Sequence, residues 1–404
     1  MSFVFFESQP KSFLGVLLSN GFRPLFLCVG LAGLLLIALW IPLFAGHITL
    51  PLGMSSILWH AHEMLFGFVG AAMGGFLLAA VSKWTGRFPV SGGALALLVV
   101  LWMSGRIAML LSGTWPAWLV ATVDVSYGFC LAALVGREII ASGNRRNYKV
   151  IVLLLVFAAL NVVFHRALAL PEWDPNIAIR GAVMQVCMML SLIGGRITPA
   201  FTRNYLIKQN PALTLAPAAF GRLDIAATLT LLAAALSWIA LPTAVFSAYL
   251  LMIAGLLQIM RLVRWKGWLA LDEPLLWILH LGFVWLGLGL VLLGAGVLDS
   301  SLGSVGFHGL GIGAMASMIL GVASRAALGH TQRPLVAGKL MTVAFMLLSG
   351  AAVLRILASL LAASLYWPLL YGAALLWLAG MLLFCIRYVP ILVKPAPSWR
   401  YPGA

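Results

Sequence analysis

The chain has 404 residues, of which 63% are hydrophobic and only 9% charged, and its formal net charge is +15. Soluble globular domains are roughly 45–50% apolar and about 25% charged, so this composition excludes a water-soluble enzyme, a disordered protein and a nucleic-acid-binding module. We expect an all-α polytopic protein whose solvent is the lipid bilayer, with 1–404 forming a single integral membrane domain.

Glycines, prolines and charged clusters divide the chain into twelve apolar segments, each near the length of about 20 residues that a spanning helix needs. In chain order the predicted spans are 24–45, 57–81, 92–112, 116–139, 150–170, 177–198, 221–241, 243–263, 274–298, 304–324, 337–362 and 367–389. No connection between them is long enough to form a soluble domain.

The basic residues are distributed unevenly between the two sides. If the N-terminus is cytoplasmic, 21 of the 25 basic residues fall in inside segments, and the outer loops 46–56, 113–115, 299–303 and 363–366 have none. Cytoplasmic loops carry an excess of Lys and Arg. This pattern predicts that both termini are cytoplasmic.

The cysteines and the N-terminal segment show no sign of disulfides, of covalently attached haem or of a signal peptide. The four cysteines show no paired spacing, so neither a disulfide framework nor a CxxCH haem attachment is expected. The first residues have no compact apolar core that ends in a cleavage site, so we do not expect a removable signal peptide.

The chain also contains a candidate internal repeat. A shift of 246 residues superimposes His62 on His308, and it aligns the Thr-x-Arg motifs that begin at 85 and 331. Because the offset spans an even number of helices, the copies (spans two and three, and spans ten and eleven) would be parallel and related by a pseudo-two-fold axis. His62 and His308 would then lie at the same depth.

Ionisable side chains inside a bilayer are costly and are therefore functional candidates. Six histidines lie in or beside the spans. On the predicted orientation, four of them lie toward the outer face, namely His60, His62, His165 and His308. The other two, His280 and His330, lie toward the inner half, so one metal ion cannot bind all six.

His60 and His62 open the second span and are followed by Glu63. On a regular helix the two histidines are about 200° apart, so they should face different partners, whereas Glu63 lies within about 60° of His60 and is placed to orient it. Neutral imidazole is a ligand of haem iron and copper. A single histidine such as His165 or His280 can instead hydrogen-bond a neighbouring helix, and that alternative stays open.

Arginines complete the polar content of the spans. Arg106 and Asp124 fall at similar depth on the hairpin of spans three and four, so a structural ion pair is one interpretation. The other is that Arg106, together with Arg355, binds haem propionates.

Several motifs together resemble the NnrS family, and the resemblance covers nearly the full length. They are GFRPLFL at 21–27, WHAHEMLFGF at 59–68, KWTGRFP at 83–89, GGRITPAFTRN at 194–204, LHLGFVWLGLGL at 279–290 and FHGLGIGAMASMILGVASRAALGHTQRPL at 307–335. The chain departs slightly from the family pattern, with HTQRP in place of HTGRP and KW in place of NW, and neither change removes a candidate ligand.

The resemblance implies a multi-pass protein of the bacterial inner membrane that contains haem and copper and is associated with denitrification and the nitric oxide stress response. By resemblance, His60, His62, His308 and His330 stand in the histidine motifs of the family and His280 in its ninth-span motif. The implied cofactors are haem b and copper.

Our functional hypothesis is that haem and copper bind nitric oxide and reduce or remove it, as in a membrane nitric oxide reductase. Reduction needs electrons from quinol or from another membrane donor, because the chain has no haem c, flavin or iron–sulfur motif. Two alternatives remain, a twelve-helix transporter, which the even span count and the repeat favour, and a nitric oxide sensor without turnover.

The repeat leads to a specific site hypothesis. His62 and His308 would bind one haem iron from opposite sides, and His60, turned away on the same helix, would help to hold the second metal. Glu63 would tune that metal site as a neighbouring carboxylate and serve as the catalytic residue.

Overall fold

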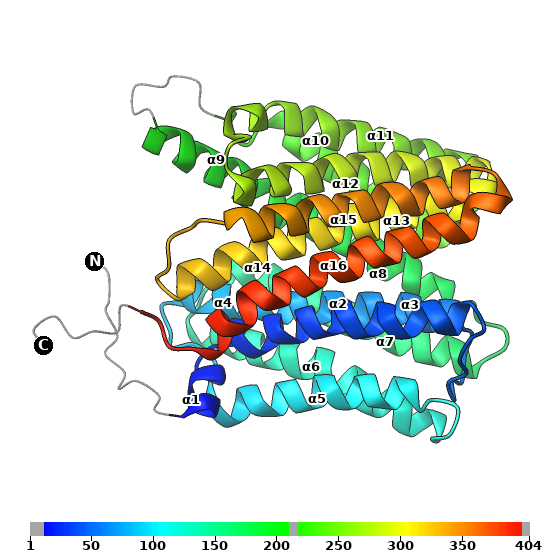
Figure 1. Ribbon diagram of the computed structural model, residues 1–404, viewed down its shortest axis with the longest axis horizontal. Helices are drawn as coiled ribbons and strands as arrows, with labels where there is room; N and C mark the ends of the chain where they lie inside the picture. The colour runs from blue at the N-terminus through cyan, green and yellow to red at the C-terminus, as the bar shows by residue number, and fades with distance from the viewer. Residues whose placement is uncertain (1–11, 210–216, 398–404) are drawn as a thin grey trace, which may run out of the picture.

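The computed structural model describes residues 12–209 and 217–397. Within these ranges the chain is helical and has no strand, and twelve helices are long and apolar enough to cross a membrane. The helices run side by side along the long axis of one bundle (Figure 1). The prediction of an all-α polytopic protein with about twelve spans is therefore confirmed.

The spans follow a short helix, α1 (Phe13–Leu17). They are α2 (Phe22–Phe44), α3 (Ser56–His62) with α4 (Gly70–Thr85), α5 (Gly92–Leu110), α6 (Ala117–Ala141), α7 (Tyr148–Ala169), α8 (Asn176–Met189) with α9 (Gly195–Gln209), α10 (Arg222–Ala240), α11 (Val245–Val263), α12 (Pro274–Leu298), α13 (Gly303–His308) with α14 (Ser317–His330), α15 (Gly338–Leu360) and α16 (Tyr366–Val393). The sixth span continues as helix to Gln209, beyond the predicted 198, because the polar stretch after Pro199 leaves the apolar pattern but stays helical.

Three spans contain a π-helical segment. These are η1 (Glu63–Val69), η3 (Leu190–Gly194) and η6 (Gly309–Ala316), in the second, sixth and tenth spans. The same spans are the most buried, with 83%, 72% and 67% of their apolar stretches inside the protein against 33–61% for the other nine. They also contact one another, since α8 touches η1 and η6, and α14 touches α4. They form the inner trio of the bundle.

The other nine spans surround the inner trio in three groups. Contacts join α5 to α6 and α6 to α7, then α10 to α11 and α11 to α12, and finally α15 to α16 and α16 to α2. The outer spans therefore pack as three groups of three neighbours. The pseudo-two-fold axis that the sequence repeat predicts stays a prediction.

Small residues allow the inner spans to pack closely. Gly and Ala dominate GAAMGG at 70–75 and GLGIGAMA at 309–316, and such residues let membrane helices approach through their backbones. At Gly306, a Cβ atom would collide with the backbone of Leu293 on α12. The packing of α13 against α12 therefore depends on glycine.

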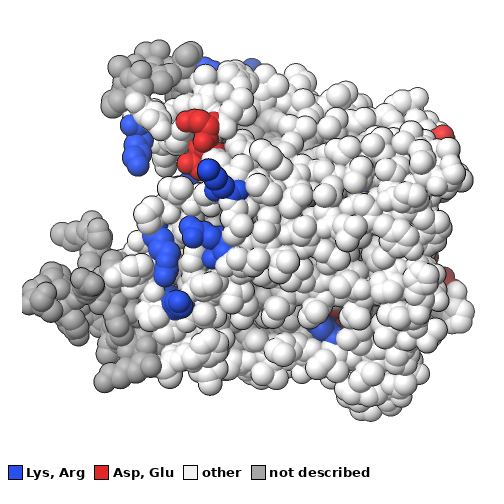
Figure 2. Space-filling view, in the orientation of Figure 1, with Lys and Arg blue, Asp and Glu red and all other residues white. Residues whose placement is uncertain are grey.

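The two ends of the bundle differ in charge. Helix α1, helix α9 and the last turns of α16 lie at one end, and α3 lies toward the other (Figure 1). On the face shown in Figure 2, most Lys and Arg residues gather at the end that carries α1 and α9. The predicted cytoplasmic location of both termini is based on this excess of basic residues at one end. Which end faces the cytoplasm stays a prediction.

Candidate functional site

The two histidines of α3 point to different surroundings. His60 lines a large cavity, and His62, the last residue of α3, is fully buried in a polar cluster. The prediction that these two residues face different partners is confirmed, because a spacing of two residues turns the side chains about 200° apart. The second span thus carries two distinct sites.

The cavity beside His60 has a volume of about 280 Å³, close to the lower end of the roughly 300–1,000 Å³ of common ligand pockets. It lies between the inner spans and α2, α15 and α16, and most of its lining is aliphatic or aromatic. The polar side chains on its wall are few: His60, Asn176, Ser304, His308 and Arg355. We refer to it as the histidine cavity.

His308 reaches the histidine cavity from α13. Its Nδ1 lies 2.8 Å from the carbonyl oxygen of Ser304. A carbonyl oxygen only accepts hydrogen bonds, so Nδ1 must donate, and Nε2 is left with a free lone pair. This is the arrangement in which a metal-binding imidazole is usually held.

His60 and Arg355 line the same cavity with atoms that have no protein partner. The His60 ring stacks on Trp40 at 4.1 Å between ring centroids. Arg355 donates from Nη1 to Ser359 Oγ at 2.7 Å. Among the residues that the structure describes, His60 Nδ1 and Arg355 Nε have no hydrogen-bond partner. Two imidazoles and one guanidinium are therefore available to a ligand.

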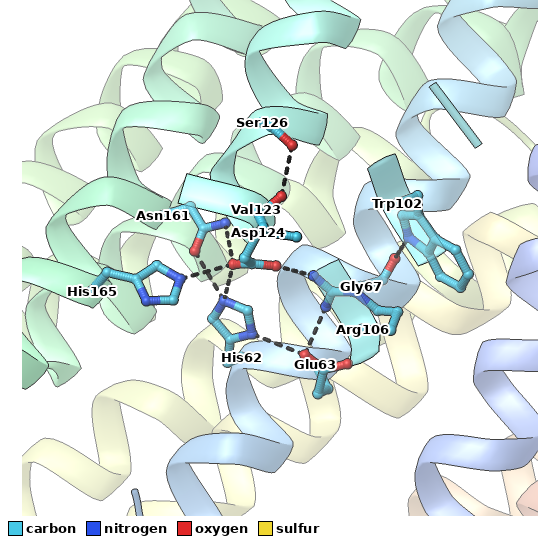
Figure 3. Close-up of polar contacts among 10 residues, drawn as sticks. All are labelled: His62, Glu63, Gly67, Trp102, Arg106, Val123, Asp124, Ser126, Asn161 and His165. Atoms are coloured by element: carbon cyan, nitrogen blue, oxygen red, sulfur yellow. Dashed lines mark hydrogen bonds and ion pairs between the residues drawn. The ribbon is translucent and has the colours of Figure 1, made fainter. Parts of the chain in front are cut away.

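The second site is a buried group of ionisable and amide side chains around Asp124 (Figure 3), which we call the Asp124 cluster. Its members come from α3, η1, α5, α6 and α7 and are His62, Glu63, Arg106, Asp124, Asn161 and His165. Asp124 Oδ2 accepts from Asn161 Nδ2 at 2.8 Å and from His165 Nε2 at 2.9 Å, and it lies 3.0 Å from His62 Nε2. Its other oxygen, Oδ1, pairs with Arg106.

The Glu63 carboxylate belongs to this cluster and pairs with His62 and Arg106, and not with the His60 side chain, which corrects the prediction. Its Oε1 lies 3.1 Å from His62 Nδ1 and 2.7 Å from Arg106 Nη1. The angular estimate considered the helix alone, whereas the Arg106 guanidinium on α5 attracts the carboxylate to the side of His62. Glu63 therefore orients His62 and holds Arg106.

Arg106 forms the structural ion pair with Asp124 that was one of its two predicted roles, and it does not line the histidine cavity. Its guanidinium lies over Gly67 of η1, where a Cβ atom would come within 2.7 Å of Nη1. Because Arg106 pairs with two carboxylates, its contacts favour the ion-pair interpretation over the propionate role. Arg355 remains available for that role.

Neighbouring helices bind the carbonyl groups at η1. Trp102 Nε1 donates to the Gly67 carbonyl at 3.0 Å, and the Tyr127 hydroxyl donates to the Gly70 carbonyl at 2.9 Å. A π-helical turn departs from the regular hydrogen-bond ladder and often occurs at functional sites. These contacts fix the segment that positions Glu63 next to His62.

The remaining predicted ligands lie elsewhere. His280 Nε2 is 2.9 Å from Thr202 Oγ1, and His330 stacks on Phe22 at 5.2 Å between ring centroids. Neither residue lines the histidine cavity or belongs to the Asp124 cluster. The expected pairing of His62 with His308 is also wrong, since His60 is the histidine that shares a cavity with His308.

The donor atoms of His62, Asp124 and His165 lie within 4.8 Å of one another, and within the described ranges this is the one group of three or more such residues that converges in this way. Sequence reasoning considered His165 as a partner in a hydrogen bond between helices, which it is, but it missed Asn161. The available signal was their spacing of four residues, which places both side chains on one face of α7.

Comparison with known families agrees with this architecture. A family model described as NnrS protein matches residues 16–396, so the chain belongs to the NnrS family. Among curated protein sequences none matches the chain. The family is associated with metal and haem binding, and membership is consistent with a role in the nitric oxide response.

Proposed function

We propose that the histidine cavity binds haem b through His60 and His308, and that the protein uses this haem in the binding and reductive removal of nitric oxide. The observation that carries the proposal is the meeting of two imidazoles, from two different inner spans, at one largely apolar cavity. A six-coordinate haem takes two nitrogen ligands of this kind, and nitric oxide would bind in place of one of the two imidazoles.

The side chains around the cavity fit the group. The hydrogen bond of His308 Nδ1 to the Ser304 carbonyl leaves Nε2 free for a metal. The unpartnered Nε of Arg355 suits a propionate, because guanidinium and carboxylate form strong charge-assisted hydrogen bonds. When bound, the haem supplies an iron that accepts and donates single electrons, and nitric oxide reduction requires electrons.

We assign the second metal, copper, to His62, Asp124 and His165. Imidazole nitrogens and a carboxylate oxygen suit copper(II). The cluster holds two carboxylates and one guanidinium, so a metal cation that binds neutral histidines there would meet one net negative charge. Glu63 accepts from His62 Nδ1, as carboxylates near metal ligands commonly do.

Nitric oxide suits this environment because it is small, uncharged and soluble in lipid. The rival function, transport, is less well supported. Substrate sites of transporters commonly lie where helices break and expose charged or polar groups, but here the carboxylates of the Asp124 cluster pair with neighbouring side chains. Electrons would come from quinol or another membrane donor.

The test begins with purified protein. We expect a Soret band in the wild type and its loss in both His60→Ala and His308→Ala, while His330→Ala, at a partly buried histidine outside the cavity, keeps it. Wild-type protein in membranes should consume nitric oxide when the quinone pool is reduced. A wild type without haem would overturn the proposal, and haem without consumption would leave the sensor function.

A further inference from the structure

A second, smaller cavity lies where the three inner spans meet. Its volume is about 100 Å³, and every residue that lines it is either apolar or glycine. Its walls come from η1 and α4, from α8, η3 and α9, and from η6 and α14, with Phe26 of α2 at one side. We call it the central chamber.

The central chamber adjoins the histidine cavity. Val69 and Met315 line both spaces, so the chamber adjoins the cavity of His60 and His308 at these two side chains. Both are apolar, and methionine is flexible enough to change its rotamer readily. A small molecule in the chamber therefore has a short apolar route to the histidines.

The backbone and the small side chains along its wall explain why the chamber is not filled by protein atoms. All three π-helical segments contribute to its wall, through Val69 of η1, Leu190, Ile193 and Gly194 of η3, and Met315 of η6. Small residues, Ala72 and Ala323, face it from two of the inner spans. Protein interiors are normally packed with few voids larger than a water molecule. A space of this size at the centre of the bundle calls for an occupant.

We propose that the central chamber binds small apolar gas molecules and supplies nitric oxide to the histidine cavity. Apolar cavities stay dry and take up small apolar molecules such as xenon. A quinol head group or an anion would find no hydrogen-bond partner among the lining side chains. The identity of the gas rests on the proposed function, whereas gas binding itself does not.

Xenon is the probe for the chamber, because its binding is read by ¹²⁹Xe nuclear magnetic resonance with or without haem. We expect saturable xenon binding in the wild type and its loss in Ala72→Phe, which fills the chamber. Ala80→Phe is the matched control, because Ala80 lies on the same helix outside the lining. If Ala72→Phe does not fold, Val322→Phe fills the chamber from a less buried position.

Rapid mixing tests the route to the haem. With haem content equal, Ala72→Phe should slow the association of nitric oxide several-fold, and Ala80→Phe should not. Xenon binding with an unchanged association rate would overturn the supply of nitric oxide to the histidine cavity. A wild type that binds no xenon, or whose chamber holds a co-purified lipid or quinone, would overturn gas binding itself. A protein without haem that still binds xenon would contradict the proposed function and not the chamber.

Discussion

The second and tenth spans are built alike, yet their matching histidines have different surroundings. In each, a short helix ends at a histidine, His62 or His308, and a π-helical segment follows. The segments begin at Glu63 and Gly309, which agrees with the offset of 246 residues. However, His62 is enclosed by carboxylates, and His308 faces the histidine cavity.

The outer helices cause this difference. Beside the second span, α5, α6 and α7 supply Arg106, Asp124 and Asn161. Beside the tenth span, the atoms nearest to Gly309 belong to Gly289, Leu292 and Ile356, and α15 supplies Arg355 to the cavity that His308 lines. The two positions that the predicted repeat aligns therefore share a backbone conformation but not their surroundings, and the histidine that shares a cavity with His308 is His60.

The removal of His62 has the largest expected effect and tests whether His62 and His308 belong to different sites. We expect His62→Ala to lose copper completely and to keep its full haem content, because His62 lies in the Asp124 cluster and not on the wall of the histidine cavity. Metal analysis and the Soret band of the same preparation give both values. Loss of haem in this variant would return His62 to the role that the repeat predicted.

The next largest effect concerns stability. Asp124→Asn should lower the free energy of unfolding by about 3–5 kcal/mol, because it leaves Arg106 without one partner in a buried ion pair. Thermal unfolding in detergent measures the change. Asp174→Asn is the control, since Asp174 is exposed and pairs with Arg180 at the surface. Equal effects of the two substitutions would show that the Asp124 cluster adds no stability.

The substitution Glu63→Gln tests whether the copper site and the haem site are separate. The glutamine keeps the size of the side chain but weakens the acceptor at His62 Nδ1, so copper affinity should fall roughly 10–100-fold. Haem content should not change, because Glu63 does not line the histidine cavity. A titration with copper under competition by a chelator measures the affinity. A loss of haem would contradict the separation of the sites.

The smallest predicted effect is that of Arg355→Lys. Lysine keeps the positive charge but not the guanidinium fork, so we expect haem affinity to fall by about 1.5 kcal/mol, or roughly tenfold. Transfer of haem to an acceptor protein measures the loss. Arg106→Lys should not change haem affinity, because Arg106 pairs with Glu63 and Asp124. A larger effect at Arg106 than at Arg355 would exchange the roles of the two arginines.

The sequence predicted the twelve helices because hydropathy and length suffice to recognise a span. It did not predict which spans are inner, because almost every span is apolar all round and burial depends on the neighbours. The angular spacing of His60 and His62 correctly separated their partners. The partner of Glu63 was predicted wrongly, because it depends on Arg106, which belongs to another helix and has no sequence relation to Glu63.

The central claim is that His60 and His308 hold one haem between them. Electron paramagnetic resonance of the oxidised wild-type protein tests it most directly, with His60→Ala, His62→Ala and His308→Ala measured alongside. We predict one low-spin ferric signal typical of two imidazole ligands, which both His60→Ala and His308→Ala remove or convert to high spin and which His62→Ala leaves unchanged. A signal that survives His60→Ala and disappears in His62→Ala would contradict the account.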